Sequence, residues 1–219
     1  MAKGNVNFTG VRAVILAPFF YHGLYVPDGS ATDPTILSDT TVMFALAHSM
    51  GCPPTEFPRS RPEYAKDIAK LAWKSSLFVQ PSSASNRVMP PIRHTLDMER
   101  EGGYQEKLQK GMRSGNVKKF WWVHEVALGS CYEGAVYGPN PFEVARMDTL
   151  VIRVGVGRLG IVRLEQINVP EEMRLNAATA RLFGQTLTEE YRILDTIRVS
   201  RAMNPVEAAE VVSTWSVSD

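Results

Sequence analysis

The stretch from residue 148 to residue 168 constrains the fold more than any other, because apolar and polar residues alternate on both sides of a glycine-rich turn. TLVIRV comes before the turn GVGRLG, and IVRLEQI follows it. Alternation with a period of two, in segments rich in β-branched residues, is typical of strands. The sequence therefore predicts a β-hairpin with a glycine-rich loop.

Four residues of this loop are candidates for binding a phosphate backbone: Gly155, Gly157, Arg158 and Gly160. Glycine allows positive φ angles and leaves main-chain N–H groups open to a ligand, and Arg158 supplies a positive charge. The alternative is an ordinary hairpin turn with a solvated arginine. GVGRLG also matches the dinucleotide-binding pattern, but that pattern needs a helix directly after it to hold the pyrophosphate. A strand follows here, so we expect no Rossmann site.

The composition is that of a globular protein with one sizeable core. The 219 residues carry a formal net charge of only +1, so any contact with nucleic acid must come from local patches. Cys52 and Cys131 lie far apart, which indicates neither a disulfide framework nor a zinc site and fits a reducing cytosol. No apolar run approaches the roughly 20 residues of a membrane span. We therefore expect a cytoplasmic protein with a single domain over residues 1–219, no membrane contact, no metal and no cofactor.

Strand-like and helix-like segments follow one another along the rest of the chain. VRAVILA predicts a central strand, residues 38–51 predict a helix capped by Ser38 or Asp39, and residues 73–79 predict another strand. We favour core packing over base stacking for the aromatic segment PFFYHGLY. Residues 120–126 are expected to return to the sheet, and LGSCYEGAVYGPNPFE is expected to contain a turn. Further helices are predicted to begin at Pro170 and at Pro205, the second within a variable tail that starts at about residue 186.

Residues 80–119 form an irregular, basic insertion in this scheme. Over residues 87–119 there are eight basic and four acidic residues, an excess of +4 in a chain whose total is +1. A long excursion of this kind is usually functional or disordered. The basic residues lead into aromatic ones, and cations that track phosphates beside aromatics that stack on bases are typical of nucleic-acid binding. The candidates are Arg87, Arg93, Arg113, Lys118, Lys119, Trp121 and Trp122, with a solvated charge run as the alternative.

The order of these features resembles the RAMP superfamily of CRISPR-associated proteins. The residues that carry the resemblance are VRAVILAPFFYHG, ILSDTTVMFALAHSMG, TLVIRVGVGRLG and the basic segment between residues 87 and 134. Within the superfamily, the chain is most similar to the Cascade subunit that caps the five-prime handle of CRISPR RNA, in its type I-D form. The resemblance implies an α+β, ferredoxin-like (RRM-related) domain with a long basic insertion and a glycine-rich-loop hairpin.

The resemblance also implies a function and partners. The chain would be a non-catalytic RNA-binding subunit of a type I CRISPR surveillance complex. It would bind the crRNA five-prime handle, contact the backbone subunit and the large subunit, and help to position target DNA near the PAM in antiviral defence. Arg158 is then the best candidate for a contact to the handle, and the cations of the insertion are candidates for RNA or DNA phosphates.

Two enzymatic alternatives remain open on the sequence alone. A metal-independent endoribonuclease that processes crRNA needs a general base and a general acid, and His22, His94 and His124 are candidates. A cytosolic α+β enzyme that binds a phosphorylated small molecule in the glycine-rich loop is the second alternative. A thiol pair of Cys131 with His124 is disfavoured against a small buried cysteine. A metal site made by His22 with Asp28, Asp33 and Asp39 is discounted, because the spacing fits no known pattern.

Overall fold

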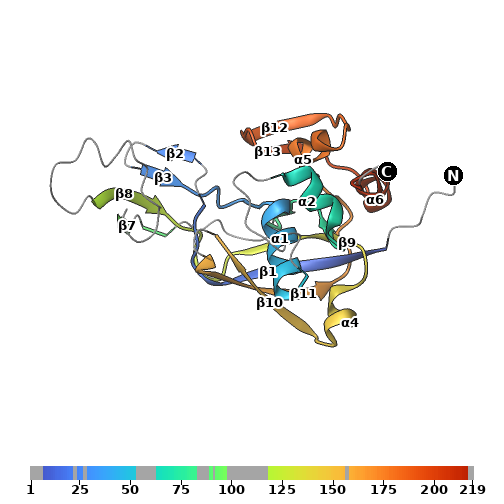
Figure 1. Ribbon diagram of the computed structural model, residues 1–219, viewed down its shortest axis with the longest axis horizontal. Helices are drawn as coiled ribbons and strands as arrows, with labels where there is room; N and C mark the ends of the chain where they lie inside the picture. The colour runs from blue at the N-terminus through green and yellow to red at the C-terminus, as the bar shows by residue number, and fades with distance from the viewer. Residues whose placement is uncertain are drawn as a thin grey trace.

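The computed structural model describes most of the chain. The described residues are 7–21, 24–26, 29–52, 63–82, 89–90, 92–97, 118–155 and 158–216. Side chains are described for the same residues apart from those of 24–26, 29–31, 92–97 and 118–121. Helices pack on one side of a large sheet, and a smaller sheet extends from the body (Figure 1).

In this part of the chain the large sheet has seven strands, six of them in the order β10-β11-β1-β9-β6-β4, with β5 also paired to β9. All of these pairings are antiparallel. The strands are β1 (Phe8–Ala17), β4 (Ile36–Leu37), β5 (Lys74–Ser75), β6 (Phe78–Val79), β9 (Cys131–Tyr137), β10 (Thr149–Val154) and β11 (Gly160–Ile167). The predicted hairpin and the predicted central position of the first strand are both confirmed.

Four of these strands have the order of a ferredoxin-like fold. Counted along the chain, β1, β6, β9 and β11 are the first to fourth strands, and in space they lie in the order fourth, first, third, second. Helix α1 (Asp39–Ser49) makes the crossover between the first two, while only the five-residue α4 (Pro141–Ala145) and the added strand β10 lie between the last two. The predicted α+β, ferredoxin-like class is confirmed, with a shortened second crossover.

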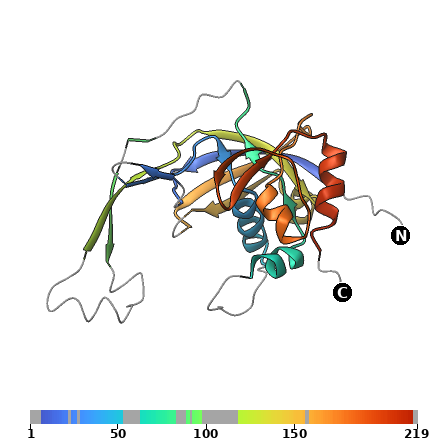
Figure 2. The ribbon, with the colours of Figure 1, turned by 90° about the horizontal axis from the view of Figure 1, so that it is seen from above.

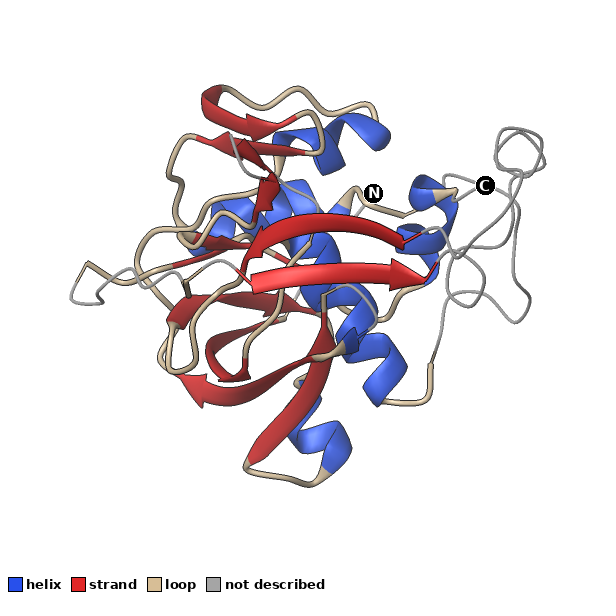
Figure 3. Ribbon diagram, turned by 90° about the vertical axis from the view of Figure 1, so that its left-hand side faces the viewer, coloured by secondary structure: helices blue, strands red, loops and turns tan. Residues whose placement is uncertain are grey.

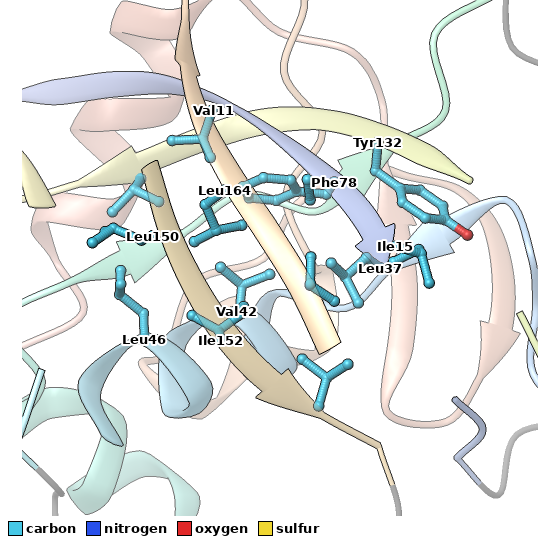
Figure 4. Close-up of a cluster of buried hydrophobic side chains, with 14 of the residues drawn as sticks. Val11, Ile15, Leu37, Val42, Leu46, Phe78, Tyr132, Leu150, Ile152 and Leu164 are labelled. Carbon is cyan, nitrogen blue, oxygen red and sulfur yellow. The ribbon is translucent and has the colours of Figure 1, made fainter. Parts of the chain in front are cut away.

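The main core lies between α1 and the inner face of the sheet. Leu150, Ile152 and Val154 of β10 point inward, and α1 buries Val42 and Leu46 against the sheet (Figure 4). Burying a side chain of this size is worth about 1.5–3 kcal/mol. The helix begins after Ser38, and Gly51, at φ 71°, follows its end. The predicted helix over residues 38–51 is therefore confirmed.

A smaller sheet, in the order β2-β3-β8-β7, forms an arm that extends away from the body (Figure 2) and lies in front of it in Figure 3. Its strands are β2 (Leu24–Val26), β3 (Gly29–Ala31), β7 (Ile92–Asp97) and β8 (Lys118–His124). Two predictions are wrong here. Residues 120–126 do not return to the large sheet, and part of the insertion expected to be irregular is β7, paired with β8 over six residues.

The turn predicted within LGSCYEGAVYGPNPFE is confirmed at Leu128 and Gly129, and the strand β9, at the centre of the large sheet, follows it. The glycine within β9 is needed for packing. A Cβ at Gly134 would lie 2.7 Å from the Phe78 ring and 2.8 Å from Ser76 Oγ, so no larger residue fits. Within this one segment, Gly129 belongs to a turn, whereas Gly134 allows the close approach of neighbouring groups.

The C-terminal part of the chain packs on the outer side of α1. It contains α5 (Ala177–Leu182), the hairpin β12 (Glu189–Leu194) and β13 (Ile197–Ser200), and α6 (Pro205–Ser213); α2 (Tyr64–Lys70) lies nearby. The predicted helix start at Pro205 is confirmed. The start predicted at Pro170 is wrong, because α5 begins after Asn176. Trp215, two residues after the end of α6, is 1% exposed.

Asp39 joins this C-terminal part to the main fold. It is fully buried, and its carboxylate accepts hydrogen bonds from Asn176 Nδ2 (2.9 Å) and Thr179 Oγ1 (2.6 Å). Burial raises the pKa of Asp39, while these hydrogen bonds act in the opposite direction. None of the helices in the described residues is long and apolar enough to cross a membrane.

Candidate nucleic-acid interface

The loop between β10 and β11 is fixed by packing against Phe19. Gly155 has φ 79°, and a Cβ there would lie 2.9 Å from Phe19 Cβ. A Cβ at Gly160 would lie 2.9 Å from both Phe19 Cγ and Val154 Cγ2. Packing therefore accounts for both glycines, and it holds the end of the hairpin on the core. Gly157 lies outside the described residues.

Arg158 is the charged side chain that this loop presents to solvent. It has a left-handed backbone at φ 54° and donates its backbone N–H to the Gly155 carbonyl at 3.1 Å. Its guanidinium Nη1 donates to Nε2 of His48, in the exposed last turn of α1, at 2.5 Å. Arg153 Nη1 donates to the Arg158 carbonyl at 3.4 Å. The structure therefore brings together two arginines and a histidine, of which the sequence had indicated only Arg158.

Phe19 also connects this loop to the base of the arm. Its carbonyl accepts the N–H of Val126 at 2.9 Å, and Val126 follows the last residue of β8 by two positions. Phe19 itself is 2% exposed, so its ring is a fixed part of the core. Sequence reasoning had predicted that Phe19 packs in the core. Its contact with both candidate regions could not be found from the sequence, because the contacting residues lie more than 100 positions away.

The arm carries several of the candidates predicted in the insertion. Lys118, Lys119, Trp121 and Trp122 lie on β8, and Arg93 lies opposite Trp122 on β7. Among these, the side chain of Trp122 is described, and it is 45% exposed. A large aromatic residue exposed to this degree on an extending strand suits stacking on a base. Arg87 and Arg113 lie outside the described residues, as does Tyr104, a weaker stacking candidate.

The arginines whose side chains the structure describes fall into two groups. Six of them lie within 4.0 Å of a carboxylate: Arg12, Arg163, Arg174, Arg181, Arg192 and Arg198. Four have no carboxylate partner: Arg146, Arg153, Arg158 and Arg201. Three of these four lie within the β10–β11 hairpin or directly before it. Unpaired positive charge is therefore concentrated at this hairpin.

The structure provides evidence on two alternatives, a reactive thiol at Cys131 and a metal site that includes Asp33 and Asp39. Burial raises the pKa of the Cys131 thiol, which disfavours the reactive thiolate. Asp39 is enclosed by its hydrogen bonds, and Asp33 accepts from the Thr35 backbone N–H at 2.7 Å. No group of three or more potential metal ligands occurs among the described residues. His22 and Asp28 are not described, and neither is the side chain of His94.

Comparisons with known proteins add little to this picture. No protein-family model matches the chain, and no curated protein matches it. One similar solved structure is a chain in the cryo-EM structure of the Type III-B Cmr-beta complex bound to cognate target RNA and AMPPnP. The two chains are 10% identical with a TM-score of 0.41, over 77% of this chain and 68% of the other. A similarity of this size supports no conclusion about function.

Proposed function

We propose that this chain is a non-catalytic RNA-binding subunit of a type I CRISPR surveillance (Cascade) complex. It binds the five-prime handle of crRNA and helps to position target DNA near the PAM in antiviral defence. Three findings support the proposal: the sequence resemblance to the RAMP superfamily, the ferredoxin-like strand order, and the unpaired arginines beside an arm that bears an exposed tryptophan.

The observation that carries the proposal is the presentation of Arg158. Its guanidinium is exposed, has no carboxylate partner and lies on a loop that Phe19 holds in place. A fixed backbone with an exposed guanidinium that no described carboxylate neutralises is well suited to bind a phosphate, because little conformational freedom is given up on binding. Arg158 therefore contacts a phosphate of the handle, with Gly155, Gly157 and Gly160 shaping the loop.

The arm supplies the second part of the surface. Trp122 stacks on a base, and Trp121 is its neighbour on the strand. Arg93, Lys118 and Lys119 contact phosphates of RNA or DNA, as do Arg87 and Arg113. Phe19 contacts both the loop and the base of the arm, and on this proposal the two parts bind the same RNA. The partners on this proposal are crRNA, target DNA, and the backbone and large subunits of a cytoplasmic complex.

The first experiment is to purify the assembled complex from its host and to extract and size the nucleic acid. The proposal expects short RNA of one defined length that begins with repeat-derived sequence. A stable homo-oligomer without nucleic acid would instead favour an enzyme that acts on a small molecule.

The sharper experiment is a salt titration of RNA binding by the Arg158→Glu variant. Removing one phosphate interaction with single-stranded RNA lowers the slope of log K against log salt by about 0.7, so we expect weaker binding and a shallower slope. Arg192→Glu is the matched control, because Arg192 lies on another hairpin and faces Asp195 at 3.4 Å. An unchanged slope for Arg158→Glu, or an equal decrease for both variants, would contradict the assignment.

The non-catalytic role has its own test. Repeat RNA incubated with the protein in EDTA should remain intact. Cleavage that is abolished in a His124→Ala or His94→Ala variant would establish the endoribonuclease alternative instead. Charge reversal at Lys118 and Lys119 should impair complex assembly or DNA binding more than the stability of the isolated chain. Normal target binding by this double variant would remove the arm from the interface.

A further inference from the structure

Strand β10 is an edge of the large sheet, and its outer side is free in the described part of the chain. The direction of its backbone groups follows from the neighbouring strands. Ile15 donates its N–H to Ser130 and accepts from Gly129, so its backbone faces β9. The backbone of Val14 therefore faces β11, where it lies opposite Arg163.

The same alternation continues across the hairpin. The backbone N–H and C=O groups of Arg163 face β1. The backbone groups of the residues on either side of it in β11 therefore face β10, where they lie opposite Leu150 and Ile152. The N–H and C=O groups of Thr149, Val151 and Arg153 consequently point away from the sheet. Among the described residues, no hydrogen bond to these outward groups is present. Six residue pairs join β10 to β11 without a bulge, so this edge is regular over its whole length.

The side chains on this edge combine apolar surface with positive charge. Val151 is 53% exposed and Met147, just before the strand, is 57% exposed. Arg153 and Arg146 are exposed and have no carboxylate partner, and Asp148 is the acidic residue between them. The edge therefore offers unpaired backbone groups, apolar contacts and a net positive charge along one line.

Two other edges in the described sheets are protected in the usual ways. Strand β4, at the opposite edge of the large sheet, has only two residues. Strand β12 carries Glu189, Glu190 and Arg192 within six residues. Short edge strands and charged residues both discourage pairing with another chain. β10 has six residues, no proline and one charged side chain, so its exposed edge needs another explanation.

The chemistry of the edge selects among possible occupants. RNA is a poor match, because outward carbonyl groups repel phosphate and apolar side chains offer it nothing. A second copy is a poor match too, since residues 146–153 contain two arginines and one aspartate and would meet the same net charge. A protein strand pairs with both N–H and C=O groups, and acidic side chains on it would face Arg146 and Arg153.

We propose that the free edge of β10 binds an extended acidic segment of a partner protein as an added strand. The segment alternates apolar residues with glutamate or aspartate, which places its carboxylates on the face of the sheet that carries Arg153 and its apolar residues on the face that carries Leu150 and Ile152. This assignment does not rest on the proposed RNA-binding function, because it uses neither Arg158 nor the arm.

Backbone amide exchange tests the proposal with a synthetic probe. The probe is a capped peptide of about eight residues that alternates glutamate and valine, and the control peptide has lysine in place of glutamate. At a concentration of ten times Kd, the acidic peptide should slow exchange at Thr149, Val151 and Arg153 by roughly tenfold. The lysine peptide should leave these three amides unchanged.

Two variants separate strand pairing from nonspecific charge attraction. Val151→Pro removes an outward N–H without touching the β10–β11 ladder, so it should weaken binding of the acidic peptide by about tenfold or more. Val151→Thr keeps the N–H and should bind normally. If Val151→Pro fails to fold, Arg153→Glu replaces it, and this variant should prefer the lysine peptide.

Five results would overturn the proposal. Exchange at these amides could already be slow in the protein alone, which would show a covered edge. It could slow with protein concentration, which would identify a second copy as the occupant. Protection by a single-stranded RNA oligonucleotide would identify nucleic acid instead. Finally, the acidic peptide could leave the three amides unprotected, or bind equally well to Val151→Pro.

Discussion

The two arginine-rich hairpins of this protein use their positive charges in opposite ways. Around the C-terminal hairpin β12–β13, every described arginine from Arg174 to Arg198 has a carboxylate partner among Glu189, Glu190 and Asp195. In β10 and its loop, Arg153 and Arg158 have none. The first set of arginines is engaged in ion pairs within the protein, and the second remains available for a ligand. The density of arginine in the sequence is therefore a poorer guide to a binding surface than the pairing in the structure.

The hairpins also differ in how they are attached to the body. The C-terminal hairpin is attached through a buried polar residue, Asn176, which reaches the carboxylate of Asp39. The hairpin β10–β11 is attached through apolar packing on Phe19. A buried polar group is costly to leave without its partners, whereas a tightly packed glycine is sensitive to added volume. The two attachments should consequently fail in different ways.

The largest effect should come from Asn176→Ala. Asn176 is fully buried, donates to Asp39 Oδ1 and the Thr196 carbonyl at 2.9 Å, and accepts from the N–H groups of Ala178 and Arg198 at 3.1 Å. Its removal leaves buried partners unsatisfied and should lower the free energy of unfolding by about 3 kcal/mol. Urea denaturation measures this change. RNA binding by the folded variant should be unaffected.

Asn204→Ala is the control for Asn176→Ala. Asn204 is also a helix N-cap and accepts from the Glu207 N–H at 2.9 Å, but it has no buried carboxylate to satisfy. Its removal should cost about 1 kcal/mol. Equal destabilisation at the two positions would mean that Asn176 acts as a helix cap alone and does not attach the C-terminal hairpin to α1.

The next effect in size is expected for Gly160→Ala. The new Cβ would meet Phe19 and the Val154 side chain, and overpacking of this kind costs about 1–3 kcal/mol. Unlike Asn176→Ala, this substitution should also weaken RNA binding, because it displaces the loop that presents Arg158. Thermal denaturation and filter binding on the same preparation would measure both quantities.

Gly184→Ala provides the comparison for Gly160→Ala. Gly184 follows α5 at φ 72° with nothing within 4 Å of an added Cβ, so only backbone strain opposes alanine there. We expect destabilisation by about 1 kcal/mol and unchanged RNA binding. If Gly160→Ala kept full RNA binding, the loop would not need Phe19 to position Arg158.

Local patterns predicted the parts of the fold that depend on them. The alternation over β10 and β11 and the apolar run of β1 each specify an element without reference to distant residues, and each of these elements was confirmed. The helix after Ser38 was confirmed too, although the Ser38 side chain makes no capping hydrogen bond to the helix backbone. Gly134 shows what local patterns leave open. A glycine can mark a turn or a close contact, and only the distant ring of Phe78 decides between them.

The candidate site shows the same division. The exposed loop and Arg158 were predicted from residue type and spacing. The contact with His48 and the absence of a carboxylate near Arg153 depend on residues far away in sequence. The arm strand β7 was missed because glycine and proline surround it, although its six residues pair regularly with β8. Long-range pairing is the information that one sequence does not contain.

The smallest effect tests the comparison of the two hairpins most directly. Arg181 pairs with Glu189 and both are partly exposed, so Arg181→Gln should lower the free energy of unfolding by about 1 kcal/mol or less. Arg153→Gln removes no ion pair and should change that free energy by less than about 0.5 kcal/mol. Binding of the acidic peptide should show the reverse order, weakened by Arg153→Gln and unchanged by Arg181→Gln.

A double-mutant cycle of Arg181 and Glu189 measures the interaction energy of this ion pair without the cost of leaving one partner unpaired. Arg153 has no carboxylate partner among the described residues, so no such cycle can be measured for it. This is the difference between the two hairpins. If Arg153→Gln destabilised the fold more than Arg181→Gln did, Arg153 would be a structural residue through its bond to the Arg158 carbonyl. Arg153 would then not be available to bind an acidic partner strand, and Arg146 would be the remaining positive charge at the free edge of β10.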